Sequence, residues 1–184
     1  STGICFIGER NFKNFLKSYL PAKPGDIIDI NTRNVVGKHD GLMYYTLGQR
    51  KGLGIGGGHG ATGDCWFVIK KDLKTNKLYV AQGNDDALYS DALISKKFNW
   101  IPKIPVEKEF ECTAKFRYRQ PDQKVKVKLL DDGSVYVEFA EKQRAVTPGQ
   151  YVVLYKNDPD SKYDNCLGGG QIDDVIKDGK VLEL

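Results

Sequence analysis

The strongest constraint on the fold is a regular alternation of apolar and polar residues in the second half of the chain. Apolar positions from Phe110 to Phe116, and again from Val125 to Leu129, alternate with polar neighbours. Successive side chains of a strand point to opposite faces, so this period predicts strands with one buried face. Asp131-Asp132-Gly133 predicts a hairpin turn, and residues 178–179 predict another. Short strands at this spacing favour a small antiparallel β-barrel over a parallel sheet.

The first half predicts one helix followed by short strands. Phe12, Phe15 and Tyr19 recur at helical spacing within residues 9–20, and Pro21 ends that pattern. Beyond it, runs separated by turn residues predict strands at residues 26–30, 35–36, 42–47, 66–69 and 78–82. The expected fold class is therefore mainly β, with a helix-led small β domain before the barrel.

Pro102 and Pro105 mark the expected boundary between these two parts. We therefore expect a short segment at residues 1–20 that carries a cysteine motif and the helix. A central β domain is expected at residues 21–102, and a carboxy-terminal β-barrel at residues 103–184. The chain begins Ser-Thr-Gly without an initiator Met, which suggests a piece of a longer protein.

Composition narrows the function class by exclusion. The chain has 184 residues, 40% of them hydrophobic and 28% charged, and its longest apolar run is far below the roughly 20 residues of a membrane span. We expect no membrane role. The four cysteines form no CxxC pair, so no metal site is predicted. Without a secretory signal, a reducing cytoplasm is the expected location. The net charge of +4 does not by itself indicate nucleic-acid binding.

Cys5 lies in the segment Gly3-Ile4-Cys5-Phe6-Ile7-Gly8, just before the expected helix. Glycine-flanked backbone near a helix start can lower the pKa of a thiol and expose its sulfur, which makes a reactive cysteine one interpretation. A buried, inert cysteine among apolar neighbours is the other, and the local sequence favours it. Cys65, Cys112 and Cys166 lie in strand-like apolar patterns, where the buried interpretation is stronger still.

The stretch from Gly48 to Gly58 is the most unusual part of the chain. Its glycines have neither the spacing of a dinucleotide-binding loop nor that of a Walker loop. A bendable backbone beside Arg50 and Lys51 suits an RNA phosphate backbone. Close packing that tolerates only glycine explains the pattern equally well.

Two cationic stripes are predicted on strand faces of the barrel. Lys115, Arg117 and Arg119 would point together to solvent, while Phe116 and Tyr118 point the other way. The alternating lysines of residues 124–128 would add a second stripe. Aligned cations suit phosphate contacts, although a solvated outer face is the commoner fate of such runs.

Several long segments, in this order, closely resemble the MnmA-type (MnmA/TrmU) tRNA-specific 2-thiouridylases. They run from near the first residue to near the last. Their sequences are STGICFIGER at residues 1–10, YLPA at 19–22, GLMYYTLGQRKGLGIGG at 41–57, FRYRQ at 116–120 and CLGGG at 166–170.

The resemblance implies an enzyme that replaces the C2 oxygen of the wobble uridine of tRNA by sulfur, after ATP adenylates that oxygen. It implies that Cys5 carries the sulfur as a persulfide, delivered by a sulfur-donor protein. A second cysteine, able to form a disulfide with Cys5, and the ATP-binding loop would belong to a preceding amino-terminal domain absent from this chain. The chain is expected to be inactive alone.

The resemblance also places Arg117 and Tyr118 where family members touch tRNA, and the barrel looks similar to barrels of translation factors. We extend the expected tRNA-binding set to Arg119, Gln120, Arg50 and Lys51. Two alternatives stay open: a noncatalytic tRNA-binding module, and a protein-binding barrel without RNA affinity.

Overall fold

The computed structural model describes residues 19–56, 63–117 and 120–183. The expected helix at residues 9–20 and the segment around Cys5 therefore lie almost entirely outside the described residues. The described chain is nearly all β, which confirms the predicted fold class. Within it, no helix is both long and apolar enough to cross a membrane.

The chain forms two compact units, residues 1–85 and 86–184. The division lies before Pro102 and Pro105, where the sequence placed a boundary. Strands β5 (Tyr89–Ser95) and β6 (Phe98–Trp100) precede those prolines but pair within the sheet of the second unit, because β5 adds to β9 and β6 to β11.

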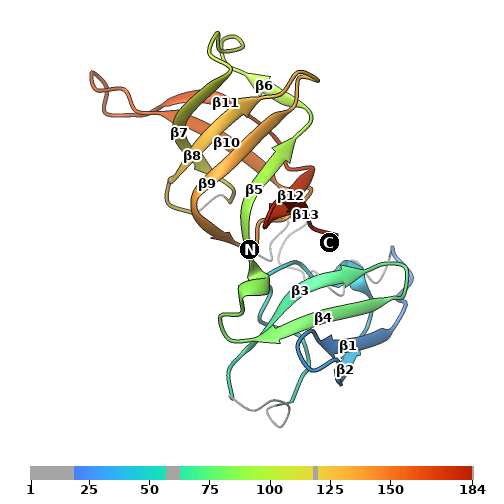
Figure 1. Ribbon diagram of the computed structural model, residues 1–184. Helices are drawn as coiled ribbons and strands as arrows, with labels where there is room; N and C mark the ends of the chain where they lie inside the picture. The colour runs from blue at the N-terminus through green and yellow to red at the C-terminus, as the bar shows by residue number, and fades with distance from the viewer. Residues whose placement is uncertain (1–18, 57–62, 118–119, 184) are drawn as a thin grey trace. The chain divides into compact units, whose positions relative to one another are not determined.

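The first unit contains a four-stranded sheet in the order β2-β1-β4-β3, drawn blue to green in Figure 1. Its strands are β1 (Gly25–Asp29), β2 (Val35–His39), β3 (Trp66–Asp72) and β4 (Lys77–Gln82). β1 pairs antiparallel with β2 but parallel with β4. Four of the five strands expected in this half are confirmed.

The strand expected at residues 42–47 is wrong. A 3-10 helix, η1 (Leu42–Tyr44), begins this segment, and the amide of Tyr45 donates to the carbonyl of Leu42. Leu42, Tyr44, Tyr45 and Leu47 are all buried, although Tyr44 and Tyr45 are adjacent. A strand with one buried face cannot bury two adjacent side chains on that face, so tertiary packing sets the conformation here.

The second unit contains one nine-stranded sheet in the order β13-β12-β5-β9-β8-β7-β10-β11-β6, antiparallel at every pairing (Figure 1). The predicted hairpin turns at residues 131–133 and 178–179 are confirmed, since they join β8 to β9 and β12 to β13. The remaining strands are β7 (Glu109–Lys115), β8 (Gln123–Leu129), β9 (Val135–Arg144), β10 (Tyr151–Lys156), β11 (Asn165–Gln171), β12 (Asp174–Lys177) and β13 (Lys180–Val181). A short 3-10 helix, η2 (Asp86–Leu88), precedes β5.

This sheet curls strongly, as a barrel requires. β11 and β12 lie near opposite ends of the strand order, yet only Ile172 and Asp173 connect them. Gly170 comes so close to β5 that a Cβ added there would lie 2.3 Å from Ser95 Oγ. The apolar side chains of the inner face, among them Val127, Val137 and Leu154, are fully buried. The curvature brings the ends of the sheet together and confirms the predicted antiparallel barrel architecture.

Candidate nucleic-acid interface

The described residues place the expected tRNA contacts in two separate regions. Arg50 and Lys51 lie in the glycine-rich loop of the first unit, whereas Arg117 and Gln120 follow β7 in the second. Tyr118 and Arg119, like Cys5, lie outside the described residues. The two regions are therefore described one at a time.

Arg117 lies in a turn and not on a strand face. β7 ends at Lys115, so the alternation expected through residue 119 stops earlier than the sequence suggested. Phe116 anchors the turn in the core, with its ring 4.8 Å from that of Phe139. Arg117 Nη2 donates to the carbonyl oxygen of Ala145 at 2.6 Å. The guanidinium is thus tied to the chain just past the end of β9.

The Arg117 guanidinium is partly desolvated and lies near a second arginine. Desolvation lowers the pKa of its guanidinium, and the positive charge of the nearby Arg144 lowers that pKa further. An arginine stays charged despite such a shift. Arg117 is exposed as a residue and has five N–H donors, of which the Ala145 bond uses one. A phosphate beside the Arg117 guanidinium could accept hydrogen bonds from its remaining N–H groups.

Three glutamines fix the Arg117 turn to β9. The Gln120 side-chain oxygen accepts from the amide of Phe116 at 3.2 Å, and its nitrogen donates to Gln143 Oε1 at 2.9 Å. Gln143 Nε2 donates to Gln123 Oε1 at 3.0 Å and to the Glu141 carbonyl at 2.9 Å. Gln143 is itself only 7% exposed. The amide of Gln120, expected to contact tRNA, is engaged within the protein and positions the turn.

Two of the three lysines in the second cationic stripe lie beside carboxylates. Lys126 forms an ion pair with Glu109, and Lys128 Nζ lies 3.8 Å from Glu138 Oε2. The hydrogen bond to Glu109 raises the pKa of Lys126. Paired surface lysines release few counterions when RNA approaches, because their charge is already balanced. This face therefore offers less to a phosphate backbone than its lysine count suggests.

The glycine-rich loop of the first unit is anchored at its start. The backbone amide of Gly48 donates to the Val68 carbonyl oxygen at 2.8 Å, and the Val68 amide donates to the backbone carbonyl oxygen of Gln49 at 3.0 Å. The Gln49 side chain accepts from the Thr46 amide and donates to the Lys51 carbonyl, at 3.0 and 2.9 Å. These bonds attach the loop to β3 and fix the backbone that carries Arg50 and Lys51.

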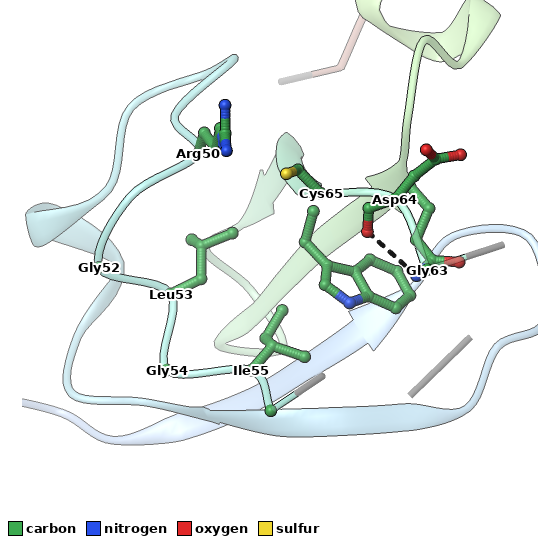
Figure 2. A pocket seen from close by; sticks show the side chains of 11 residues that line it. Arg50, Gly52, Leu53, Gly54, Ile55, Gly63, Asp64 and Cys65 are labelled. Atoms are coloured by element: carbon green, nitrogen blue, oxygen red, sulfur yellow. Dashed lines mark hydrogen bonds between the residues drawn. The ribbon is translucent and has the colours of Figure 1, made fainter. Parts of the chain in front are cut away.

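The same loop forms one wall of a cavity of about 300 Å³. Leu53 and Ile55 project from the loop, Arg50 lies at one side, and Asp64 and Cys65 lie on the other side (Figure 2). Trp66 and Gln82 complete the lining from the start of β3 and the end of β4. Gly52 and Gly54 have φ of 78° and 69°, a conformation that favours glycine, so the loop needs glycine for its path.

The described cysteines differ in exposure. Cys65 and Cys166 are exposed free thiols, contrary to the burial expected from their sequence context. Both lie at or near the start of a strand, where the apolar pattern is incomplete. Burial raises the pKa of the half-buried Cys112 thiol to about 12. Among the described residues, no group of His, Cys, Asp and Glu side chains could hold a metal ion.

Sequence reasoning missed the residues around the end of β9. Gln143, Arg144 and Ala145 form the other half of the Arg117 environment, although no periodic pattern marks them. The one available signal is a polar pair, Gln143-Arg144, directly before the apolar Ala145-Val146.

Both units match known domain families. Residues 13–82 match the family described as the tRNA methyl transferase PRC-barrel domain, and residues 90–172 match the aminomethyltransferase β-barrel domain. The chain is therefore of the class that joins these two β domains in tandem, in agreement with the two units of the structure.

Three bacterial relatives match over nearly the whole chain. A tRNA-specific 2-thiouridylase MnmA from Halalkalibacterium halodurans is 59% identical over 178 residues, 96% of this chain and 45% of the relative. Those of Oceanobacillus iheyensis and Listeria innocua are 55% and 57% identical, and cover 100% and 99% of this chain and 47% and 46% of the relatives. The chain belongs to the tRNA-specific 2-thiouridylase family. It spans about half the length of these curated relatives.

Proposed function

We propose that this chain is the tRNA-holding, carboxy-terminal part of a 2-thiouridylase that thiolates C2 of the wobble uridine. The observation that supports it best is the Arg117 turn, where Arg117 and Arg144 lie close enough to repel each other. Such a pair of like charges, one after β7 and one at the end of β9, fits a phosphate group. The family of the chain supports tRNA as the nucleic acid.

In this proposal the tRNA surface consists of two parts. Arg117 contacts a phosphate, Tyr118 and Arg119 extend that contact, and Gln120 holds the turn in place. Arg50 and Lys51 bind the RNA backbone from the first unit. These contacts fix the position of the RNA and supply most of the salt-dependent affinity.

We further propose that Cys5 carries the sulfur. Its thiolate attacks the outer sulfur of a persulfide on a donor protein, the S–S bond of the donor breaks, and the donor leaves as a thiolate. Cys5 then holds a persulfide for transfer to the uridine, and a cysteine outside this chain can later close a disulfide onto Cys5. Reaction in the cytoplasm, where tRNA is found, fits this scheme.

ATP, in this proposal, serves a part of the enzyme outside this chain. The glycine-rich loop does not suit a nucleotide triphosphate, because the chain enters β3 at Trp66 without a helix N-terminus among the described residues. We therefore assign no described residue to adenylation. The chain by itself is expected to bind tRNA without thiolating it, and thiolation by the pure chain would contradict this assignment.

Binding is tested by titrating fluorescently labelled tRNA with the chain at two salt concentrations. Affinity should fall as salt rises, and Arg117→Ala should weaken binding and reduce the slope of log affinity against log salt by about one. A chain that shows no salt-dependent tRNA affinity would instead favour the protein-binding alternative.

The sulfur-carrying role is tested separately by treating the chain with a low-molecular-weight persulfide and analysing its peptides by mass spectrometry. Cys5 should gain one sulfur atom faster than the exposed Cys166, and Cys112 should stay unmodified. If Cys5 gains sulfur no faster than Cys166 while tRNA still binds, the chain is a noncatalytic tRNA-binding module.

A further inference from the structure

We propose that the cavity beneath the glycine-rich loop receives one unstacked nucleobase of the bound RNA. This inference rests on the proposed function, since it requires that the chain bind RNA. The cavity of about 300 Å³ lies at the lower end of the roughly 300–1,000 Å³ range of small-molecule sites. A single planar base is a suitable occupant for a site of that size.

The lining matches the two kinds of surface that a base presents. Leu53 and Ile55 supply apolar side chains on the loop side (Figure 2), and Trp66 adds an aromatic group. Asp64 and Gln82 supply polar atoms on the other side, where Gln82 Nε2 also donates to the Asp64 carbonyl at 3.3 Å. Proteins read single-stranded RNA in this way, with apolar contact to the base face and hydrogen bonds to its edge.

The distribution of charge favours a base inside the cavity and a phosphate outside it. Arg50 lies at the side of the cavity (Figure 2), and Lys51 follows it on the exposed loop. The other described lining residues are neutral or acidic, so they add no second cation that would draw a phosphate inside. The backbone of the RNA can therefore follow Arg50 and Lys51 while one base turns inward.

The described walls of the cavity are preformed, which lowers the entropic cost of binding. Gln49 and Val68 anchor the loop start, as described above. At the far end of the described loop, Ile55 packs against β2, where a Cβ on Gly37 would lie 3.5 Å from Ile55 Cγ1. The amide of Gly83 donates to the Cys65 carbonyl at 2.9 Å and fixes the opposite wall.

Cys65 provides a direct probe of occupancy, because its exposed thiol lines the cavity. The chain is alkylated with iodoacetamide alone, with tRNA, with a single-stranded RNA, or with a blunt RNA duplex of equal phosphate number. Each RNA is present at a concentration that saturates binding, and labelling of each cysteine is followed by peptide mass spectrometry. Cys166, an exposed thiol in the other unit, is the reference.

We expect tRNA and single-stranded RNA to slow the labelling of Cys65 about fivefold or more relative to Cys166, and duplex RNA to leave it unchanged. Bound tRNA without protection of Cys65 would overturn the base pocket and leave the proposed tRNA binding intact. Equal protection by the duplex would also overturn it, since a duplex offers no unstacked base. Absence of any tRNA binding would overturn both proposals.

Substitutions give a second measurement. Cys65→Phe should fill the cavity and weaken single-stranded RNA binding about fivefold or more, with little change in duplex binding, whereas Cys65→Ser should bind normally. Arg50→Ala should cost more affinity than the matched change Lys51→Ala, because only Arg50 lines the cavity. Equal effects at Arg50 and Lys51, together with normal binding by Cys65→Phe, would refute the proposal. If Cys65→Phe does not fold, the alkylation experiment on the unaltered chain still tests whether the cavity binds a base.

Discussion

Replacing Gln143 by Ala should destabilise the second unit more than any other single change in the glutamine cluster. The side chain of Gln143 accepts one hydrogen bond from Gln120 and donates one each to Gln123 and the Glu141 carbonyl. A typical hydrogen bond contributes about 1 kcal/mol, and a buried group left without its partner costs about 1–3 kcal/mol. Water can reach the half-buried Gln120 and Gln123, so we expect a loss of roughly 2 kcal/mol in the free energy of unfolding.

The measurement needs a signal from the second unit alone. The chain has two tryptophans, Trp66 in the first unit and Trp100 in the second. In a Trp66→Phe background, the fluorescence of Trp100 therefore reports the melting of the second unit. For a domain of about 100 residues, roughly 2 kcal/mol corresponds to a fall of about 8–16 °C in Tm.

Gln123→Ala is the matched control, because it removes one bond to Gln143 and one to the Pro121 carbonyl in a more exposed setting. It should lower Tm by less than half as much. Gln143→Ala should also weaken tRNA binding, since the Arg117 turn loses its attachment to β9. If both variants melt within about 2 °C of the parent, the cluster is not a structural clamp and the predicted magnitude is wrong.

Three further predictions test other parts of the molecule. Arg117→Ala should lower the salt dependence of tRNA binding. Lys126→Ala should leave that dependence nearly unchanged, because the Glu109 carboxylate already balances the charge of Lys126. Binding titrations at several salt concentrations measure both effects. Cys112 should resist alkylation at pH 8, where a thiol with a pKa of about 12 is almost wholly protonated, and become reactive in denaturant. Since the folded pKa exceeds the unfolded value, this thiol should also make unfolding easier as pH rises from about 9 toward 12, which urea titrations at each pH would detect. Gly168→Ala should disrupt the β11–β6 pairing, because its Cβ would lie 2.1 Å from the Asn99 carbonyl oxygen. It should lower Tm far more than Gly133→Ala, because Gly133 also has a positive φ but has open space around it.

In the second unit, β8 and β9 were predictable because each buries one face, whereas β5, β6 and β12 were not predicted. Val125, Val127 and the hairpin at residues 131–133 give a local period and a local turn, and neither needs distant information. The same reasoning wrongly predicted a strand at residues 42–47, where the adjacent side chains of Tyr44 and Tyr45 are both buried. Their conformation depends on the packing around them, which no local period encodes.

The candidate interface was predictable only in part. Charge and the resemblance to a family predicted Arg117, Arg50 and Lys51 as RNA contacts, which stays a prediction, and the sequence did not predict what surrounds them. The clamp on Arg117 joins Gln120 to Gln143, and amide pairs at that separation leave no periodic signal in a single sequence. The cavity likewise depends on Asp64 and Gln82 meeting the loop in space, which the sequence alone does not show.

The pairing of strands bears on why the cations that we propose as RNA contacts lie outside the strands. On the strand faces, register places a carboxylate opposite two outward lysines of β8: Lys126 lies between Glu111 and Glu138, and Lys128 lies opposite Glu109. Opposite charges across strands stabilise the sheet and cancel its field. The β7–β8 ladder ends at Ala114 and Gln123, so Arg117 lies beyond the last cross-strand pair. The charge of another arginine, Arg144 at the end of β9, lowers the pKa of Arg117, so two positive charges lie near the place where the strand ends and the chain turns.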